Sequence, residues 1–389
     1  MRSQKHFNFR QAWAALGVMV VLLAVSLPVR AAEPFRIGAF LAVTGQGSFL
    51  GAPALATFRL YIQLLNAQGG LLGRKVQLLD YDVGIDSKTA QVAVQRLIGP
   101  DRADVIIGGS TTGVTMAVLP LIARAGIPFI SLAESAAIID PVRKWVFKTP
   151  PTGRMACARI LQDLKNRRIT KFALLSGDGG FGRTMRNHCI NLAEPFGLQV
   201  VEDQVYKSRS RRFFVGLKRI HENKEVEAVV NVGFGTTPAF ITKTYRKLKF
   251  TVPLYQSQGA ATQDYLDLAG EAAEGVRLPV APLILLDRLP ENDPVRPVIS
   301  AYHRFYQKRW GVPPSVFGGY AHDAIQLVVS AVRRGKTFNK ESVRRMIETT
   351  SGVIGTSGAI RMTRDNHLGL ELNAFRMAEI RGGTCELVE

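Results

Sequence analysis

Short, uninterrupted apolar segments alternate with amphipathic segments along most of this chain, and this pattern limits the possible folds more than any other feature. Residues 104–108 and 127–131 are continuous apolar runs, and residues 113–124 between them have helical periodicity. Strands that are apolar on both faces and are connected by helices are typical of parallel sheets covered on both sides. The sequence therefore predicts an α/β fold built on doubly wound parallel sheets.

The alternation occurs in two blocks that meet near Pro150-Pro151. In the first block we expect strands at 35–43, 76–81, 104–108 and 127–131, with helices at 53–67, 86–98 (N-capped by Asp86) and 113–124. The second block has predicted helices at 153–167, 183–195, 213–222 and 238–248 and strands at 171–176, 198–205, 227–233 and 252–256. A proline-rich connector then leads to helices at 295–309, 318–334 and 341–350 and to a hairpin-like end at 359–362 and 370–380. The 389 residues fit two lobes at roughly 100–200 residues per domain.

The first 31 residues have the pattern of a secretory signal peptide. Arg2, Lys5 and Arg10 precede an uncharged run, and Val29 and Ala31 place small residues at the −3 and −1 positions of a cleavage site. The alternative is a membrane anchor, but the apolar run is at the short end of the ~20 residues that span a bilayer. No twin-arginine pair precedes the run, so we expect export in the unfolded state, cleavage after Ala31 and a periplasmic location.

The chain is strongly basic, with 50 Lys and Arg against 31 Asp and Glu, a formal net charge of +19. Removal of residues 1–31 takes away four basic residues and no acidic ones, which leaves +15. Nucleic acid is the first partner that such a charge indicates. Export counts against it, and the basic clusters at 207–212 and 243–249 lack interleaved stacking aromatics. We therefore expect no nucleic-acid partner, and a basic surface facing solvent or anionic lipid headgroups.

Cysteine and histidine give no sign of a metal site. The three cysteines, Cys157, Cys189 and Cys385, form no Cys-x-x-Cys pair, and the six histidines show no metal-ligand spacing. In an oxidising compartment Cys157 and Cys189 could pair, but the sequence leaves this open.

The segment Gly177–Gly182 fits the pattern G-x-G-x-x-G between a predicted strand and a predicted helix, with Glu202 and Asp203 about twenty residues further on. This is the pattern of a dinucleotide site, and a dinucleotide-dependent enzyme is one candidate function. Its position in the second block, export without a bound cofactor and the bulky Phe181 count against it. A glycine-rich turn is the other reading. No G-x-S-x-G elbow or paired carboxylates are present, so we expect neither catalysis nor a cofactor.

Three hydroxyl-rich loops follow predicted strands of the first block, at 44–48, 108–113 and 131–135. Loops at the carboxyl ends of parallel strands line the crevice where open α/β sheets bind ligands. The second loop also opens a helix, whose free N–H groups could hold a carboxylate. Each loop alone could serve only as a helix cap, but three together favour a binding site.

These loops belong to a longer series of motifs that resembles the type I periplasmic solute-binding proteins of the leucine/isoleucine/valine-binding class. The series runs through Ile37-Gly38, Thr44–Gly51, Asn66–Gly70 with Gly73, Asp80–Asp82, Ile106–Gly109, Gly126–Ser131, Asp178–Gly182, Ala273–Gly275 and Tyr320–Ala324. The resemblance implies two lobes joined by three crossovers, with a ligand between them. It places lobe 1 at 32–151 plus 277–357 and lobe 2 at 152–276 plus 358–389.

The resemblance also implies a set of ligand-binding residues. The positions that hold a ligand carboxylate in the first lobe match Thr112, Ala133 and Ser135, and Leu50 lies in the first loop. In the second lobe the positions that clamp the ligand match Phe181 and Phe234. The acidic position that pairs with an α-ammonium matches Gln258, and here the sequence departs from the family.

An ammonium without a carboxylate partner is costly to bury, by several kcal/mol. Together with the apolar Leu50, Phe181 and Phe234, Gln258 predicts a ligand that carries a carboxylate but lacks an α-amino group, such as an aromatic or aliphatic acid. Glu134 could supply the missing charge from the first lobe. We expect a monomeric binding protein that delivers its ligand to an inner-membrane ABC permease. The alternative within the same fold is a ligand-sensing module for a receptor or regulator.

Overall fold

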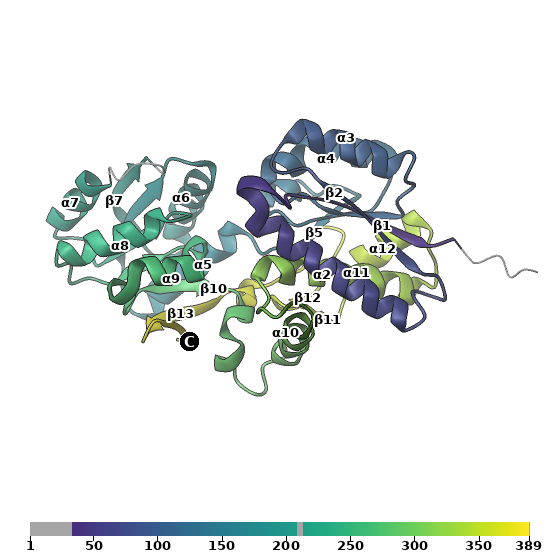
Figure 1. Ribbon diagram of the computed structural model, residues 1–389. Coiled ribbons are helices and arrows are strands. Elements are labelled where there is room, and N and C mark those ends of the chain that lie inside the picture. The colour runs from purple at the N-terminus through teal and green to yellow at the C-terminus, as the bar shows by residue number, and fades with distance from the viewer. Residues whose placement is uncertain (1–32, 208–212, 389) are drawn as a thin grey trace, which may run out of the picture. The chain divides into compact units, whose positions relative to one another are not determined.

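The computed structural model describes residues 33–207 and 213–388, and it divides the chain into two units, Met1–Pro34 and Phe35–Glu389. The predicted signal peptide lies outside the described residues. All the elements below belong to the second unit (Figure 1).

The first sheet is a five-stranded parallel sheet with the strand order β2-β1-β3-β4-β5. Its strands are β1 (Phe35–Leu41), β2 (Val76–Asp82), β3 (Val105–Gly108), β4 (Phe129–Ser131) and β5 (Val146–Lys148). All residues of β3 and β4 are buried, as the continuous apolar runs predict. Those of β5 are buried as well, although the sequence did not predict this strand. Asp86 accepts a hydrogen bond from the Thr89 N–H, which confirms the predicted N-cap.

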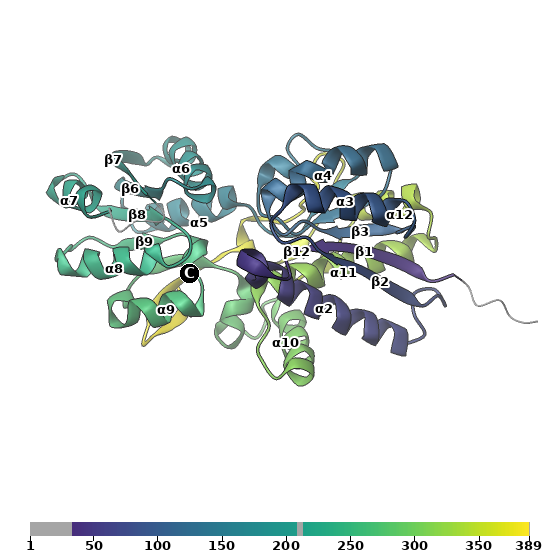
Figure 2. The ribbon, with the colours of Figure 1, turned by 45° about the horizontal axis from the view of Figure 1, so that its top comes forward.

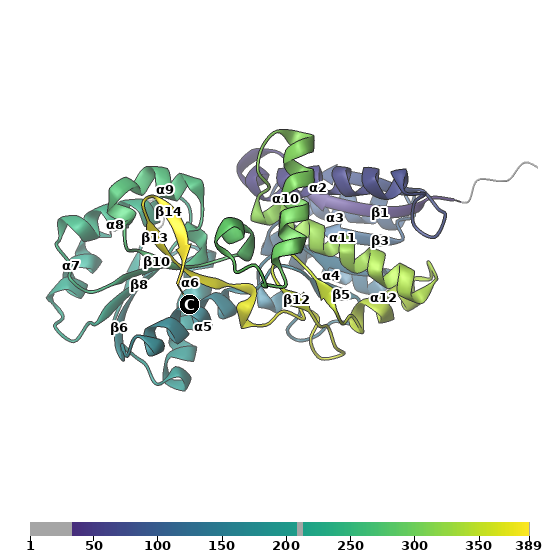
Figure 3. The same ribbon diagram turned by 90° about the horizontal axis from the view of Figure 1, so that it is seen from below.

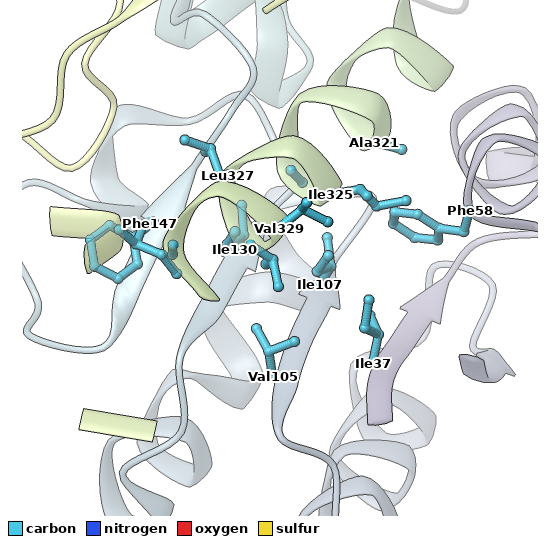
Figure 4. Close-up of a cluster of buried hydrophobic side chains, with 14 of the residues drawn as sticks. Ile37, Phe58, Val105, Ile107, Ile130, Phe147, Ala321, Ile325, Leu327 and Val329 are labelled. Atoms are coloured by element: carbon cyan, nitrogen blue, oxygen red, sulfur yellow. The ribbon is translucent and has the colours of Figure 1, made fainter. Parts of the chain in front are cut away.

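Helices cover both faces of the first sheet. Helices α3 (Ser87–Ile98) and α4 (Thr112–Ala125) lie over one face, as Figures 1 and 2 show. On the other face lie α2 (Ser48–Ala67), α11 (Val316–Gly335) and α12 (Lys340–Glu348), which are seen from below in Figure 3. Figure 4 shows Ile325 and Val329 of α11 packed with Phe58 of α2 and with strand residues such as Ile107. This layering is the doubly wound fold that the alternation predicts.

Within the described part of the chain, Gly45–Ala67 is long and apolar enough to span a membrane by length and composition alone. It contains α2, whose Leu55, Phe58 and Ile62 are buried in the core beneath the first sheet. The burial of α2 in the core therefore explains why this segment is apolar.

The second sheet has seven strands in the order β14-β13-β10-β9-β8-β6-β7. Its strands are β6 (Lys171–Gly177), β7 (Gln199–Tyr206), β8 (Ala228–Val232), β9 (Leu254–Gln256), β10 (Arg277–Val280), β13 (Arg376–Arg381) and β14 (Thr384–Leu387). The first five elements in chain order, β6 to β10, run parallel, and β13 and β14 add an antiparallel edge. Both sheets therefore begin with the same winding, 2-1-3-4-5.

Helices also cover both faces of the second sheet. One core contains side chains of α5 (Gly153–Asn166) and α6 (Gly180–Ala193). The opposite core contains side chains of α7 (Phe214–Glu222), α8 (Thr237–Lys247) and α9 (Gln263–Ala269). This core continues to α10 (Arg296–Trp310), which contacts α2 rather than the strands of the second sheet. A disulfide joins Cys157 of α5 to Cys189 of α6, which answers the question that the sequence leaves open.

The chain passes between the two sheets three times, after β5, after β10 and before β13, as the resemblance implies. Residues 277–280 form β10 and pair with β9 and β13 of the second sheet, although the predicted boundary assigns them to lobe 1. The end of the chain also differs in detail from the prediction. β12 (Ala359–Ile360) pairs with β11 (Val353–Ile354), and the terminal hairpin is β13 with β14. Gly382 and Gly383, both with positive φ, form its two-residue turn.

Candidate ligand-binding site

The loops after β1 and β3 lie at the point where the winding of the first sheet reverses. A buried hydrogen bond connects them, since Ser110 Oγ accepts from the Ala42 N–H at 3.0 Å. In the second sheet the loops after β6 and β8 have the equivalent position, and they lead to Phe181 and Phe234. Such switch points are where open α/β sheets bind ligands.

Phe181 and Phe234 contact each other, with ring centroids 5.5 Å apart. Gly259, next to Gln258, lies against both rings. A Cβ atom on Gly259 would come within 3.1 Å of Phe234, 3.2 Å of Phe181 and 2.7 Å of the Gly233 carbonyl oxygen. Only glycine fits this position without a shift of the backbone, so the close approach of Gly259 brings Phe181, Phe234 and Gln258 together.

Three further aromatic side chains extend this pair. The ring centroid of Phe49, at the start of α2, lies 5.9 Å from that of Phe234 and 5.6 Å from that of Phe317 on α11. The ring centroids of Phe317 and Tyr320 are 6.1 Å apart. We call these five residues the aromatic cluster. It joins loops of the second sheet to helices that cover the first. Phe234 is 46% exposed and Phe49 is 44% exposed, so the cluster presents hydrocarbon surface to solvent.

Sequence reasoning missed Phe49, Phe317 and Tyr320. Tyr320 lies in a motif that the resemblance quotes, and Phe49 adjoins Leu50, but neither fact shows where the ring points. Leu50 itself is half-buried on α2.

A second contact between elements of the two sheets is the hydrogen bond from Gln258 Nε2 to Glu134 Oε1, at 2.7 Å. Glu134 follows β4, and Gln258 follows β9. Among the described residues the Glu134 carboxylate has no other hydrogen bond and no ion pair. Gln258 Oε1 is buried and also lacks a hydrogen-bond partner there. The pair therefore offers two unused acceptor oxygens.

Lys148 at the end of β5 is fully buried beside this pair. Its Nζ donates to the carbonyl oxygens of Glu134 (2.8 Å) and Pro150 (2.5 Å) rather than to a carboxylate. Burial raises the pKa of Glu134 and lowers that of Lys148, while the attraction between the two charges opposes both shifts. Lys148 thus balances the charge of Glu134 from a distance and leaves the carboxylate oxygens available.

The predicted carboxylate-binding groups lie in loops that are held by their own hydrogen bonds. The Ala133 N–H donates to Ser131 Oγ (3.1 Å), and Ser135 Oγ accepts from the Ala137 N–H (3.3 Å). Thr112 is exposed in the first turn of α4, where the neighbouring Thr111 is the N-cap. Among the described interactions, no hydrogen bond connects Thr112, Ala133 or Ser135 with the residues around Gln258.

The G-x-G-x-x-G segment has a packing role. A Cβ atom on Gly182 would lie 2.1 Å from the Gly177 carbonyl oxygen, so α6 starts in close contact with the end of β6. Of the two acidic residues at the distance that a dinucleotide ribose needs, Asp203 is paired with Arg186 of α6, and Glu202 accepts a hydrogen bond from Gln204. Within residues 33–207 and 213–388, no group of three or more metal-ligating side chains is present.

Two doubly wound parallel sheets, linked by three crossovers and meeting through loops at the carboxyl ends of their strands, define a bilobal solute-binding protein. The chain matches the model of the periplasmic binding protein family over residues 34–384, and it belongs to that family. This confirms the predicted family and fold, and it confirms that the chain belongs with binding proteins rather than enzymes. The family name also implies a periplasmic location.

Curated relatives cover only part of this chain. Leu/Ile/Val-binding protein homolog 7 of Brucella suis is 26% identical over 202 residues, which are 49% of this chain and 50% of the relative. Leu/Ile/Val-binding protein homolog 8 of Brucella abortus is 26% identical over 210 residues, which are 51% and 50% of the two chains. This chain thus spans about half the length of the curated relatives it matches.

Solved structures match almost the whole chain. An extracellular ligand-binding receptor from Rhodopseudomonas palustris HaA2 is 24% identical, with a TM-score of 0.79 over 92% of this chain and 100% of that one. The substrate-binding protein LivJ of the branched-chain amino acid transporter of Streptococcus pneumoniae, in complex with isoleucine, is 18% identical, with a TM-score of 0.75 over 92% and 99%. At these identities the likeness shows the fold.

Proposed function

We propose that this protein captures a small carboxylate-bearing ligand, similar in size to an amino acid, between its two lobes and delivers it to an inner-membrane ABC permease. The observation that carries this proposal is the meeting of the aromatic cluster and the Glu134–Gln258 pair, because both join elements of one sheet to elements of the other. A ligand held there would stabilise the state in which the two sets of elements are together. The names of the Leu/Ile/Val-binding relatives support this ligand class.

Different residues would bind different parts of the ligand. The N–H groups and hydroxyls of Thr112 and Ser135, at the start of α4 and after β4, are the groups that would hold the carboxylate. Ala133 lies in the same loop as Ser135, and its N–H would have to leave Ser131 Oγ to join them. Leu50 and the aromatic cluster would cover the hydrocarbon part. A pocket of this composition, mostly apolar with a few polar groups, is typical of small-molecule sites.

The contacts of Glu134 bear on whether the ligand has an amino group. The sequence argument for an amine-free acid depends on the absence of negative charge at Gln258, but Glu134 brings a carboxylate into hydrogen-bond contact with that side chain. A buried acceptor without a donor costs about 1–3 kcal/mol. Two unused acceptors beside one negative charge therefore favour a ligand that supplies N–H donors, and an amine-free aromatic or aliphatic acid becomes the alternative.

Export through a cleaved signal peptide at residues 1–31 and action as a monomer complete the proposal. The basic head, the uncharged run and the small residues at positions 29 and 31 support the export signal.

A thermal-shift screen followed by calorimetry tests the proposal. The screen compares leucine, isoleucine and valine with their amine-free counterparts, with aromatic carboxylates and with NAD. We expect saturable binding of one ligand per chain by a compound of the first three classes. Stabilisation by NAD alone, or no binding of any carboxylate, would contradict the proposal. Loss of cellular uptake of the ligand after removal of the protein would distinguish transport from sensing.

A further inference from the structure

A cleft with a volume of about 650 Å³, open to solvent on one side, lies between α10, α11 and β11 and shares no residue with the aromatic cluster or with the Glu134–Gln258 pair. Small-molecule sites enclose about 300–1,000 Å³. We call this cleft the α10–α11 pocket. The proposed transport function does not use it.

One face of α11 lines the pocket with polar side chains. His322, Gln326, Ser330 and Arg333 follow one another at intervals of four, four and three residues, and this spacing places them on the same side of the helix. Tyr61 of α2 adds a hydroxyl group. Five polar groups of this lining have no hydrogen-bond partner among the described residues. They are Tyr61 OH, His322 Nε2, the Gln326 amide, the Ser330 hydroxyl and the Arg333 guanidinium.

His322 is the most informative of these residues because it is only 4% exposed. Its Nδ1 lies 2.9 Å from Asp323 Oδ1, and the same carboxylate accepts from the Thr356 N–H at 2.7 Å and from Thr356 Oγ1 at 3.0 Å. A carboxylate oxygen accepts hydrogen bonds, so Nδ1 carries the proton. In the neutral ring Nε2 is then an acceptor. It has no donor among the described residues and is not enclosed by them, so a molecule in the pocket can donate a hydrogen bond to it.

The charge of the lining favours an anion. The pocket contains Arg333 and Arg334 and no Asp or Glu. Arg334 donates to the carbonyl oxygen of Thr349 and to Thr350 Oγ1 and is committed to the local structure. Arg333 is exposed and has no ion-pair partner among the described residues, so its charge is available at the rim.

Hydrocarbon surface lies between the two polar ends, from Val298 of α10, Val329 of α11 and Ile354 of β11. His322 and Arg333 are eleven residues apart, about 16 Å along a helix axis. Both side chains point back toward the helix N-terminus, and because arginine is longer than histidine its guanidinium comes nearer to His322. The remaining gap suits a molecule with the size of a substituted aromatic ring.

We propose that the α10–α11 pocket is a second ligand site that binds a small hydroxylated organic acid. The carboxylate of the ligand pairs with Arg333, its hydroxyl group donates to His322 Nε2, and its hydrocarbon part covers Val298, Val329 and Ile354.

The test uses 4-hydroxyphenylacetate as the probe, with phenylacetate (no hydroxyl) and 4-hydroxyphenylethanol (no carboxylate) as matched compounds. The imidazole nitrogens of the full chain are labelled, and the His322 signals are assigned by comparison with His322→Phe. We expect the probe to shift the His322 Nε2 signal saturably and to bind at least about fivefold more tightly than either matched compound, a difference of about 1 kcal/mol.

Two exposed arginines provide the variant and its control. Arg333→Gln should lower the affinity for the probe by about fivefold or more. Arg304→Gln, on α10 but outside the pocket lining, should leave this affinity unchanged. An unshifted His322 signal, equal binding of phenylacetate, or full affinity in Arg333→Gln would each overturn the proposal. The readout is local to His322, so it is independent of whether Glu134 and the aromatic cluster bind the transported ligand.

Discussion

Glu134→Gln tests the binding of an ammonium group directly. The substitution keeps the size of the side chain and an oxygen that can accept from Gln258 Nε2, but it removes the negative charge. A hydrogen bond to a charged group contributes about 1.5–3 kcal/mol. We therefore expect the affinity for leucine to fall roughly 10- to 150-fold. The affinity for 4-methylpentanoate, which is leucine without its amino group, should stay constant or rise.

Calorimetry with both ligands on the native protein, on Glu134→Gln and on the control Glu202→Gln measures this difference. Glu202 is a half-buried glutamate on β7 whose described partner is Gln204. Equal losses for the two ligands would show that Glu134 acts through packing alone, and tighter binding of 4-methylpentanoate than of leucine to the native protein would refute the reasoning.

The ionisation of Glu134 sets the direction of the pH dependence of binding. Burial raises the pKa of Glu134 above its ordinary value, and an ammonium ligand needs the ionised carboxylate. Leucine affinity should therefore fall as the pH is lowered through that raised pKa, and Glu134→Gln should remove this dependence. Calorimetry over the pH range 5 to 8 or so would measure it.

Three further substitutions test the framework around the site. Gly259→Ala should lower the free energy of unfolding by about 1–3 kcal/mol and weaken ligand binding, because its Cβ would lie 2.7 Å from a backbone oxygen; an unchanged urea midpoint would contradict this. Replacing Cys157 and Cys189 by serine opens a loop of 32 residues and should cost about 4 kcal/mol, measured by urea unfolding against the native protein. The pKa of Glu227 is lowered by backbone N–H groups at the start of β6, so its contribution to stability is present above pH 4.5 and is lost as the pH falls through the lowered value. The difference in unfolding midpoint between the native protein and Glu227→Gln should therefore be larger at neutral pH than in acid, and a constant difference would speak against the assignment.

Regular patterns made the fold predictable from the sequence. Continuous apolar runs identify buried parallel strands. The N-cap at Asp86 and the double proline before α5 mark the starts of two helices. The placement of residues 277–280 was harder to predict, because Arg277–Val280 contains a proline and an arginine. The pairing of β10 depends on partners about 20 and 100 residues away in the chain, Tyr255 and Glu379.

The candidate site was predictable only in part. Loops after parallel strands are positions that sequence can identify; Phe234 and Gln258 follow strands in this way, and Phe181 lies in the first turn of the helix after β6. The direction of a side chain and its partner across the two sheets depend on tertiary packing, which a linear pattern does not encode. Glu134 is an example, since its contact with Gln258 spans 124 positions in the chain. The buried Lys148 is another example, because the sequence of a short strand does not show which groups the ammonium of its lysine will contact.

In both sheets, which share one winding, the positions that can tolerate substitution are distinct from the positions that cannot. Residues in the interior of β3, β4, β6 and β8 are enclosed on both faces, whereas the residues that would select the ligand lie in the loops beyond the strand ends and in the first turns of the neighbouring helices. A change in ligand preference therefore requires substitutions at only a few positions, all of them outside the strands that form the sheet interiors. Related chains can in this way diverge in the solute they recognise while their folding free energy stays nearly constant.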